Sequence, residues 1–101
     1  KTNVKVCSAH KNTLQVLSVI TELDKNEKHV LVTIAGMSNA LSGVVAANTR
    51  YPVLACPPFK DQLDMMVNIN STLQMPSNIP VLTILNPENC ALAIQRILKQ
   101  F

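Results

Sequence analysis

Residues 29–36 read His-Val-Leu-Val-Thr-Ile-Ala-Gly, and this stretch decides the fold class. Nearly every position in it is apolar, which is typical of a strand buried on both faces, as in a parallel sheet. Gly36 ends the run, and Ser38 or Asn39 can then cap a helix that continues to about Asn48. The stretch therefore predicts a β-strand followed at once by an α-helix.

The same alternation of strand and helix extends from this stretch to both ends of the chain. Strands are predicted at about residues 4–7, 51–56 and 81–85, and helices at about residues 13–23, 61–73 and 87–100. Asn86, Pro87 and Glu88 mark the clearest helix start, with a capping residue, a proline and an acid in order. The pattern predicts an α/β fold of three αβα layers, with a parallel sheet of about four strands, in a single domain over residues 1–101.

Composition excludes several classes of protein. The chain is 48% hydrophobic and 15% charged, which excludes disorder. Aromatic residues make up 3% and the net charge of +3 comes from scattered bases, so no nucleic-acid partner is expected. No apolar stretch approaches the ~18 residues of a membrane span, and no apolar signal segment is visible, so no membrane partner is expected.

The three cysteines indicate the compartment. Cys7, Cys56 and Cys90 are odd in number and far apart, each within apolar sequence. We expect free, buried thiols in a reducing, cytoplasmic protein rather than a disulfide framework. The spacing also lacks the paired ligands of a zinc site, so no metal is expected. At Cys56 a buried thiol is favoured over a nucleophile. His29 is expected to be a structural residue at the surface, and the Met65–Met66 pair is expected to pack in the core.

Small and polar residues cluster just after the predicted strands, at the carboxyl ends where parallel sheets bind ligands. Ser8, His10 and Lys11 follow the first strand. A histidine in this place can titrate near neutral pH and move a proton to or from a substrate, and the lysine offers a cation to a phosphate or carboxylate. The alternatives are a surface histidine and a solvated loop lysine.

Residues 35–43, Ala-Gly-Met-Ser-Asn-Ala-Leu-Ser-Gly, include both glycines of the chain. Gly36 permits a tight turn, small residues let a ligand approach the backbone, and the following helix N-terminus offers N–H groups to an anion. Ordinary strand-to-helix packing with a capping serine is the alternative. Neither a G-x-G-x-x-G nor a P-loop pattern occurs, so NAD and ATP are not indicated.

Four segments in order resemble the phosphoribosylaminoimidazole (AIR) carboxylase family, PurE. They are Ser-Ala-His-Lys at 8–11, the glycine segment at 35–43, the Tyr-Pro-Val and Cys-Pro-Pro motifs within 51–58, and Ser-Thr-Leu-Gln-Met-Pro-Ser at 71–77. Lys11 and the Ser-Asn-Ala-Leu-Ser-Gly segment resemble the class II enzymes, and Ala40 stands where class I enzymes carry a second histidine. Residues 48–53 resemble the animal form, which is fused to a succinocarboxamide synthetase domain.

The resemblance implies a flavodoxin-like fold and a carboxy-lyase of de novo purine biosynthesis. Such an enzyme reversibly carboxylates AIR with carbon dioxide to carboxy-AIR, without ATP, biotin, metal or other cofactor. His10 would carry the proton, and Ser8 and Lys11 would bind the ribose phosphate or orient His10. Gly36, Ser38 and Asn39 would line the carbon dioxide or carboxylate pocket. The resemblance also implies a homo-oligomer, an octamer with sites at subunit contacts.

The chain also departs from the family pattern. The family's N-terminal βα unit, with its first strand and Gly-Ser-x-Ser-Asp phosphate loop, has no counterpart among these residues. In the flavodoxin-like strand order it lies between the first two strands predicted here, so either the chain belongs to a longer one or those two strands pair directly. Met37 and Gln74 stand where class II enzymes commonly carry arginine, and Asn78 replaces a usual glycine. The alternative function is a non-catalytic or incomplete relative that serves as a nucleotide-binding or assembly domain.

Overall fold

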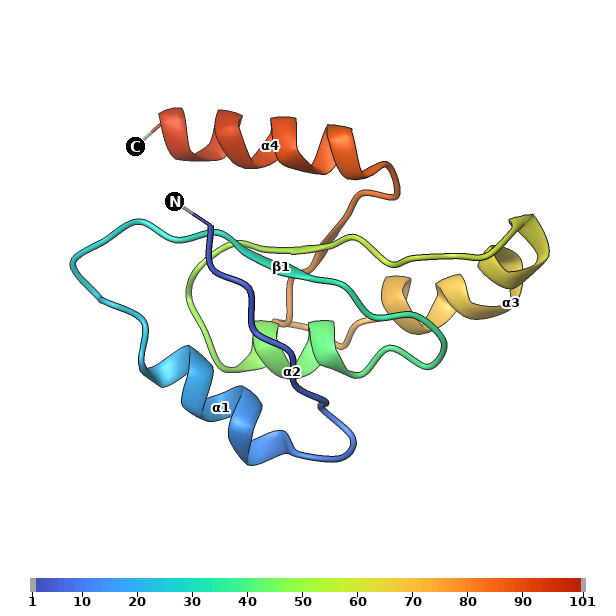
Figure 1. Ribbon diagram of the computed structural model, residues 1–101, viewed down its shortest axis with the longest axis horizontal. Helices are drawn as coiled ribbons and strands as arrows, with labels where there is room; N and C mark the ends of the chain where they lie inside the picture. Colours follow the sequence, from blue (N-terminus) through green and yellow to red (C-terminus); the bar gives the residue numbers. More distant parts are fainter. Residues whose placement is uncertain (1, 101) are drawn as a thin grey trace.

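The computed structural model describes residues 2–100, in which helices and strands alternate along the chain (Figure 1). The helices are α1 (Thr13–Thr21), α2 (Leu41–Ala47), α3 (Gln62–Leu73) and α4 (Pro87–Lys99), and the strands are β1 (Leu31–Thr33), β2 (Val53–Ala55) and β3 (Leu82–Thr83). The strands lie in the order β1-β2-β3 and both pairings are parallel. The α/β class predicted from the sequence is confirmed.

Two core clusters, one on each face of β2, hold the layers together. Val53 packs with Val16 of α1 and Val45 of α2. The next residue, Leu54, points to the opposite face because side chains alternate along a strand, and it packs with Cys90 of α4. Figure 1 accordingly shows α4 on one side of the sheet and α1 and α2 on the other. The αβα layering follows from this alternation.

Side-chain caps explain where three of the helices begin. Asn12, Asp61 and Asn86 each accept a hydrogen bond from the backbone N–H three residues later, which satisfies one of the free donors of the first turn. Pro87 follows Asn86 at the first helical position, so the predicted start of the last helix is confirmed. The apolar face of this helix packs on the chain's own sheet through Cys90, Ile94 and Ile97.

The three cysteines are free thiols, as predicted, but Cys7 is half-buried rather than buried. Cys56 and Cys90 are buried together on the α4 face of the sheet. Burial, reinforced by the neighbouring Cys56 thiol, raises the pKa of the Cys90 thiol. Both groups therefore behave as small apolar side chains.

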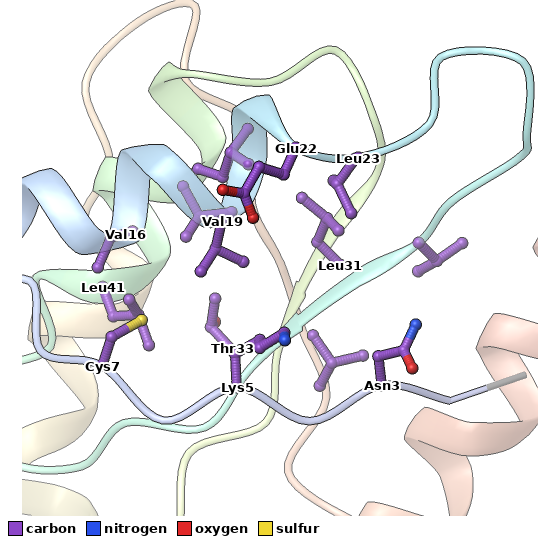
Figure 2. A pocket seen from close by; sticks show the side chains of 14 residues that line it. Asn3, Lys5, Cys7, Val16, Val19, Glu22, Leu23, Leu31, Thr33 and Leu41 are labelled. Atoms are coloured by element: carbon purple, nitrogen blue, oxygen red, sulfur yellow. The ribbon is translucent and has the colours of Figure 1, made fainter.

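The strand predicted at residues 4–7 does not form. Within residues 2–100 the sheet has three strands rather than about four, because β1 pairs with β2 alone. Val4 and Val6 are 81% and 90% exposed. A strand forms only where its backbone pairs with that of a neighbouring strand. Residues 4–7 and β1 instead line a common cavity of about 450 Å³, and their backbones do not pair (Figure 2). The alternative in which the two strands pair directly is therefore wrong.

Two helices also leave large apolar side chains exposed. In α1, Val16 and Ile20 face the core while Leu14 is exposed. In α3, Leu63, Met66 and Val67 are 71%, 63% and 69% exposed, so core packing of Met66 is wrong. The reason is the position of α3, which lies beyond the end of the short sheet rather than on one of its faces (Figure 1).

None of the helices in residues 2–100 is long and apolar enough to cross a membrane.

Candidate functional site

The turn before α1 carries three of the predicted site residues. The Ser8 hydroxyl accepts a hydrogen bond from the Lys11 N–H at 3.1 Å, and the Ser8 carbonyl accepts one from the Asn12 N–H at 2.8 Å. His10 and Lys11 lie at the tip of this turn with exposed side chains, whereas Ser8 is half-buried. Ser8 therefore shapes the turn, and the two titratable side chains remain accessible to a ligand.

The loop after β1 begins with a close approach between two strand ends. A Cβ added at Gly36 would lie 3.3 Å from the Pro58 carbonyl oxygen, in the loop after β2. This contact is tight for any side chain, which explains the glycine. Gly36 therefore brings the loops that follow the two neighbouring strands together at the carboxyl edge of the sheet.

Met37, inside a motif segment, and Asn78, just after one, have a left-handed backbone. Met37 has φ 55° and Asn78 has φ 71°. Asparagine tolerates this region better than other side chains, so it is a physically suitable replacement for a glycine at position 78. Methionine has no such preference, and a conformation of this kind persists only when its surroundings hold it.

A buried network of hydrogen bonds anchors the other end of the loop. The Asn39 side-chain amide donates to the hydroxyls of Ser42 at 2.8 Å and Thr72 at 3.1 Å, and its carbonyl oxygen accepts the Ser42 N–H at 3.2 Å. The Ser42 and Thr33 hydroxyls lie 2.6 Å apart. All four residues are buried, and within residues 2–100 no buried side-chain polar atom lacks a partner. The network ties β1, the loop, α2 and α3 together.

The network also changes the expected role of the α2 N-terminus. Ala40 occupies the N-cap position and has no capping side chain, so the capping hydrogen bond comes from Asn39, one of the two predicted caps. Because Asn39 takes the Ser42 N–H, fewer free N–H groups remain for an anion than the sequence indicated. The Asn39 side chain itself is fully engaged inside the protein.

Ser71, near the end of α3, contacts the loop on both sides of Ser38. Its hydroxyl accepts the Asn39 N–H at 3.0 Å and lies 2.9 Å from the Met37 carbonyl oxygen. Sequence reasoning singled out residues 71–77 as a motif but missed this contact, and it missed Thr33, Ser42 and Thr72. Ser42 and Thr72 lie within the motif segments at 35–43 and 71–77, but no local pattern in the sequence indicates that their hydroxyls meet.

The predicted site residues thus fall into two groups. Gly36, Ser38 and Asn39 form one loop, whereas Ser8, His10 and Lys11 lie in the turn before α1. In Figure 1 the loop lies to the right, past the end of β1, and the turn lies lower and nearer the middle, where the chain enters α1. No hydrogen bond joins the two groups within the described residues.

No predicted site residue lines the cavity of about 450 Å³. Lys5 and Cys7 line it on one side, and Val19 and Leu31 on another (Figure 2). Nor do three or more His, Cys, Asp or Glu side chains within residues 2–100 come together as a metal site. The candidate site is therefore the pair of loops at the end of the sheet, not the cavity beside β1.

Comparison with known proteins identifies related chains. The family model described as AIR carboxylase matches residues 1–100. Phosphoribosylaminoimidazole carboxylase of Archaeoglobus fulgidus is 46% identical over 94 residues, which cover 93% of this chain and 51% of that protein. The bifunctional carboxylase and succinocarboxamide synthetase of Drosophila melanogaster is 38% identical over 94% of this chain and 22% of its own length.

A solved structure shares the fold. The crystal structure of Treponema denticola PurE superposes with a TM-score of 0.81 at 39% identity, over 93% of this chain and 60% of that one. The chain thus spans half to three-fifths of the length of the single-function relatives, and less of the bifunctional one.

Proposed function

Because the chain belongs to the AIR carboxylase family, we propose that it takes part in the reversible carboxylation of AIR by carbon dioxide in de novo purine biosynthesis. The observation that carries the proposal is the family match over residues 1–100, which includes both loops of the candidate site. We place the protein in the cytoplasm, where the substrate of such a pathway would be made.

The chemistry needs few catalytic groups. The aminoimidazole ring of AIR is an enamine, so its ring carbon is already a nucleophile. Its electron pair forms a bond to the carbon of carbon dioxide, and the ring carbon then carries both the new carboxylate and its original hydrogen. Removal of that hydrogen as a proton restores the aromatic ring. The protein has to hold the two reactants together and move one proton.

We assign the proton transfer to His10. A histidine suits this role because its ordinary pKa lies near neutral pH, and it can accept the proton in carboxylation and return it in decarboxylation. The exposed position of His10 at the tip of a turn also supports exchange of that proton with solvent. Lys11, one residue further on, offers its ammonium group to the ribose phosphate.

The other predicted residues act through the backbone. The Ser8 hydroxyl holds the turn that presents His10 and Lys11. Gly36 and Ser38 provide an accessible stretch of backbone beside the substrate, and Asn39, whose side chain is engaged with Ser42 and Thr72, contributes by holding that stretch in place. Met37 and Gln74 are exposed and uncharged, so in this assignment Lys11 supplies the positive charge for the phosphate.

We further propose that copies of the chain associate into an octamer, with the exposed face of α3 as one contact. Leu63, Met66 and Val67 lie on that face and are exposed in the single chain. A contiguous exposed apolar patch of this kind is typical of an interaction surface. Sedimentation of the purified chain should show the assembly, and Val67→Glu should dissociate it. A monomeric wild-type chain would contradict the contact. Fusion to a succinocarboxamide synthetase domain, as in the animal relatives, is compatible with this arrangement.

The test of the function is turnover without ATP. Decarboxylation of carboxy-AIR is followed spectroscopically for the wild-type chain, for His10→Asn and for His29→Asn. Removal of the proton carrier should lower kcat by about 100-fold or more. His29 is the matched control, because its ring Nε2–H donates to the Asp24 carbonyl and the ring packs on Tyr51, and this variant should keep its activity. Absence of turnover in the folded wild-type chain would refute the function.

A further inference from the structure

One hydroxyl group from α3 contacts the backbone on both sides of Ser38, an exposed residue of the candidate site. The Ser71 hydroxyl accepts the Asn39 N–H at 3.0 Å and lies 2.9 Å from the Met37 carbonyl oxygen, although Ser71 is more than 30 residues away in sequence. These two contacts involve the backbone on either side of Ser38. The Ser71 side chain therefore holds the backbone on both sides of Ser38, the residue that the proposed function places beside the substrate.

The backbone of Met37, next to Ser38, needs support from the residues around it. Met37 has φ 55°, a conformation that is unfavourable for residues other than glycine and asparagine. The Ser71 hydroxyl is the donor available to the Met37 carbonyl, and the same hydrogen can turn to the Asn68 carbonyl, also at 2.9 Å. The Asn39 N–H contact persists in either orientation, because it uses a lone pair of the hydroxyl.

Thr72 adds a second, buried attachment next to the first. Its hydroxyl accepts from the Asn39 amide at 3.1 Å, and both groups are buried. Consecutive residues of α3 thus hold the backbone and the side chain of Asn39. Because buried hydrogen bonds are costly to leave unmade, we expect the loop and the end of α3 to stay attached to each other.

We propose that Ser71 is a positioning residue of the AIR site, which fixes the backbone of Met37 to Asn39 so that Ser38 faces the substrate. The expected effect of Ser71 on turnover rests on the proposed function. Its expected effect on the backbone of the loop rests on the hydrogen bonds alone. Thr72 supports the same loop from the core side. Neither residue touches the substrate in this assignment.

The experiment compares Ser71→Ala with a matched control, Ser18→Ala. The Ser18 hydroxyl also lies on a helix, but it bonds to Glu22, the residue that follows α1. NMR spectra of each variant report the backbone resonances of Met37 and Ser38 and the amide exchange of Asn39. Kinetics of carboxy-AIR decarboxylation report kcat and KM separately, and Ser71→Thr, which keeps the hydroxyl, serves as the rescue.

We expect Ser71→Ala to shift the Met37 and Ser38 resonances, to speed exchange at Asn39, and to lower kcat/KM by about 10-fold, since small displacements of positioned groups cost this much or more. Ser71→Thr and Ser18→Ala should resemble the wild type in both measurements. Unchanged Met37 and Ser38 resonances in Ser71→Ala would overturn the proposal, as would a loss of activity that Ser71→Thr does not rescue.

Two further arrangements keep the test decisive. If Ser71→Ala does not fold, Ser71→Cys preserves the volume and removes most of the hydrogen-bonding strength, and the same resonances are compared. If the wild-type chain shows no turnover, the proposed function fails, while the NMR comparison still decides whether Ser71 fixes the loop.

Discussion

Two segments that lie close to β1 are held in very different ways. Residues 36–40 after the strand are attached to α2 and α3 by side-chain hydrogen bonds, several of them buried. Residues 2–7 run beside the strand, yet they are largely exposed, and Cys7 is the member of the segment that packs against the core. One segment finds partners for its polar groups within the described chain, and the other leaves a cavity beside β1.

The difference shows what fixes a loop in a small α/β domain. Apolar composition alone does not fix a segment against the core, because residues 2–7 include two valines that remain exposed. The loop after β1 is fixed by residues more than 30 positions away, whose hydroxyls meet its amide groups. We therefore expect the loop to be rigid and residues 2–7 to be loosely held, and four measurements compare these two segments with each other or with the firmly bonded sheet.

Amide hydrogen exchange should give the largest contrast. The N–H groups of Cys56 and Ile84 are bonded across the sheet, at 2.9 and 3.0 Å, and should exchange about a thousandfold more slowly than those of residues 3–6. NMR-detected exchange measures both sets in one sample. Comparable protection at residues 3–6 would mean that this segment pairs with β1 in solution.

Loss of the network should have the next largest effect. Asn39→Ala removes three hydrogen bonds and leaves the Ser42 N–H without its partner, so we expect the free energy of unfolding to fall by about 2–4 kcal/mol. Urea denaturation measures this change. Asn68→Ala is the control, because its amide bonds to Asp64 on the same helix, and it should cost less than about 1 kcal/mol. Equal losses would remove the buried network as the cause.

A smaller effect is expected where residues 2–7 meet the core. Cys7 is half-buried against the cluster of Val16 and Val45. Cys7→Ser places a hydroxyl against apolar side chains and should lower the free energy of unfolding by about 1 kcal/mol. Cys7→Ala separates the polar from the packing contribution. A cost as large as that of Asn39→Ala would place this segment in the core.

The smallest effect should come from the exposed part of the same segment. Val6 is 90% exposed, so Val6→Thr should change the free energy of unfolding by less than about 0.5 kcal/mol. Val53→Thr, at a buried position with the same substitution, should be clearly destabilising. If the two variants lose similar stability, the described position of residues 2–7 is not the one in solution.

The sequence was informative where local patterns decide the structure. The apolar runs at 29–36, 51–56 and 81–85 and the Asn86-Pro87 helix start correspond to β1, β2, β3 and α4. The run at residues 4–7 looks the same locally but forms no strand, because pairing depends on which backbone lies beside it. The exposed face of α3 likewise follows from its place beyond the sheet, which periodicity does not encode.

The candidate site divides in the same manner. The motifs identified the turn at residues 8–11 and the loop at residues 36–39, and those roles stay predictions until a ligand is bound. The Thr33, Ser42 and Thr72 network was not predictable, because its members are ordinary in sequence and meet only after α3 folds back onto the loop.

Titration of the isotope-labelled chain with AIR, followed by NMR, tests most directly which of the two segments belongs to the site. We expect the amide resonances of residues 8–11 and 36–39 to shift with a common affinity, while those of residues 3–6 and 30–32 beside the cavity stay in place. Shifts confined to the cavity lining, or no shifts at all with the folded chain, would contradict the account.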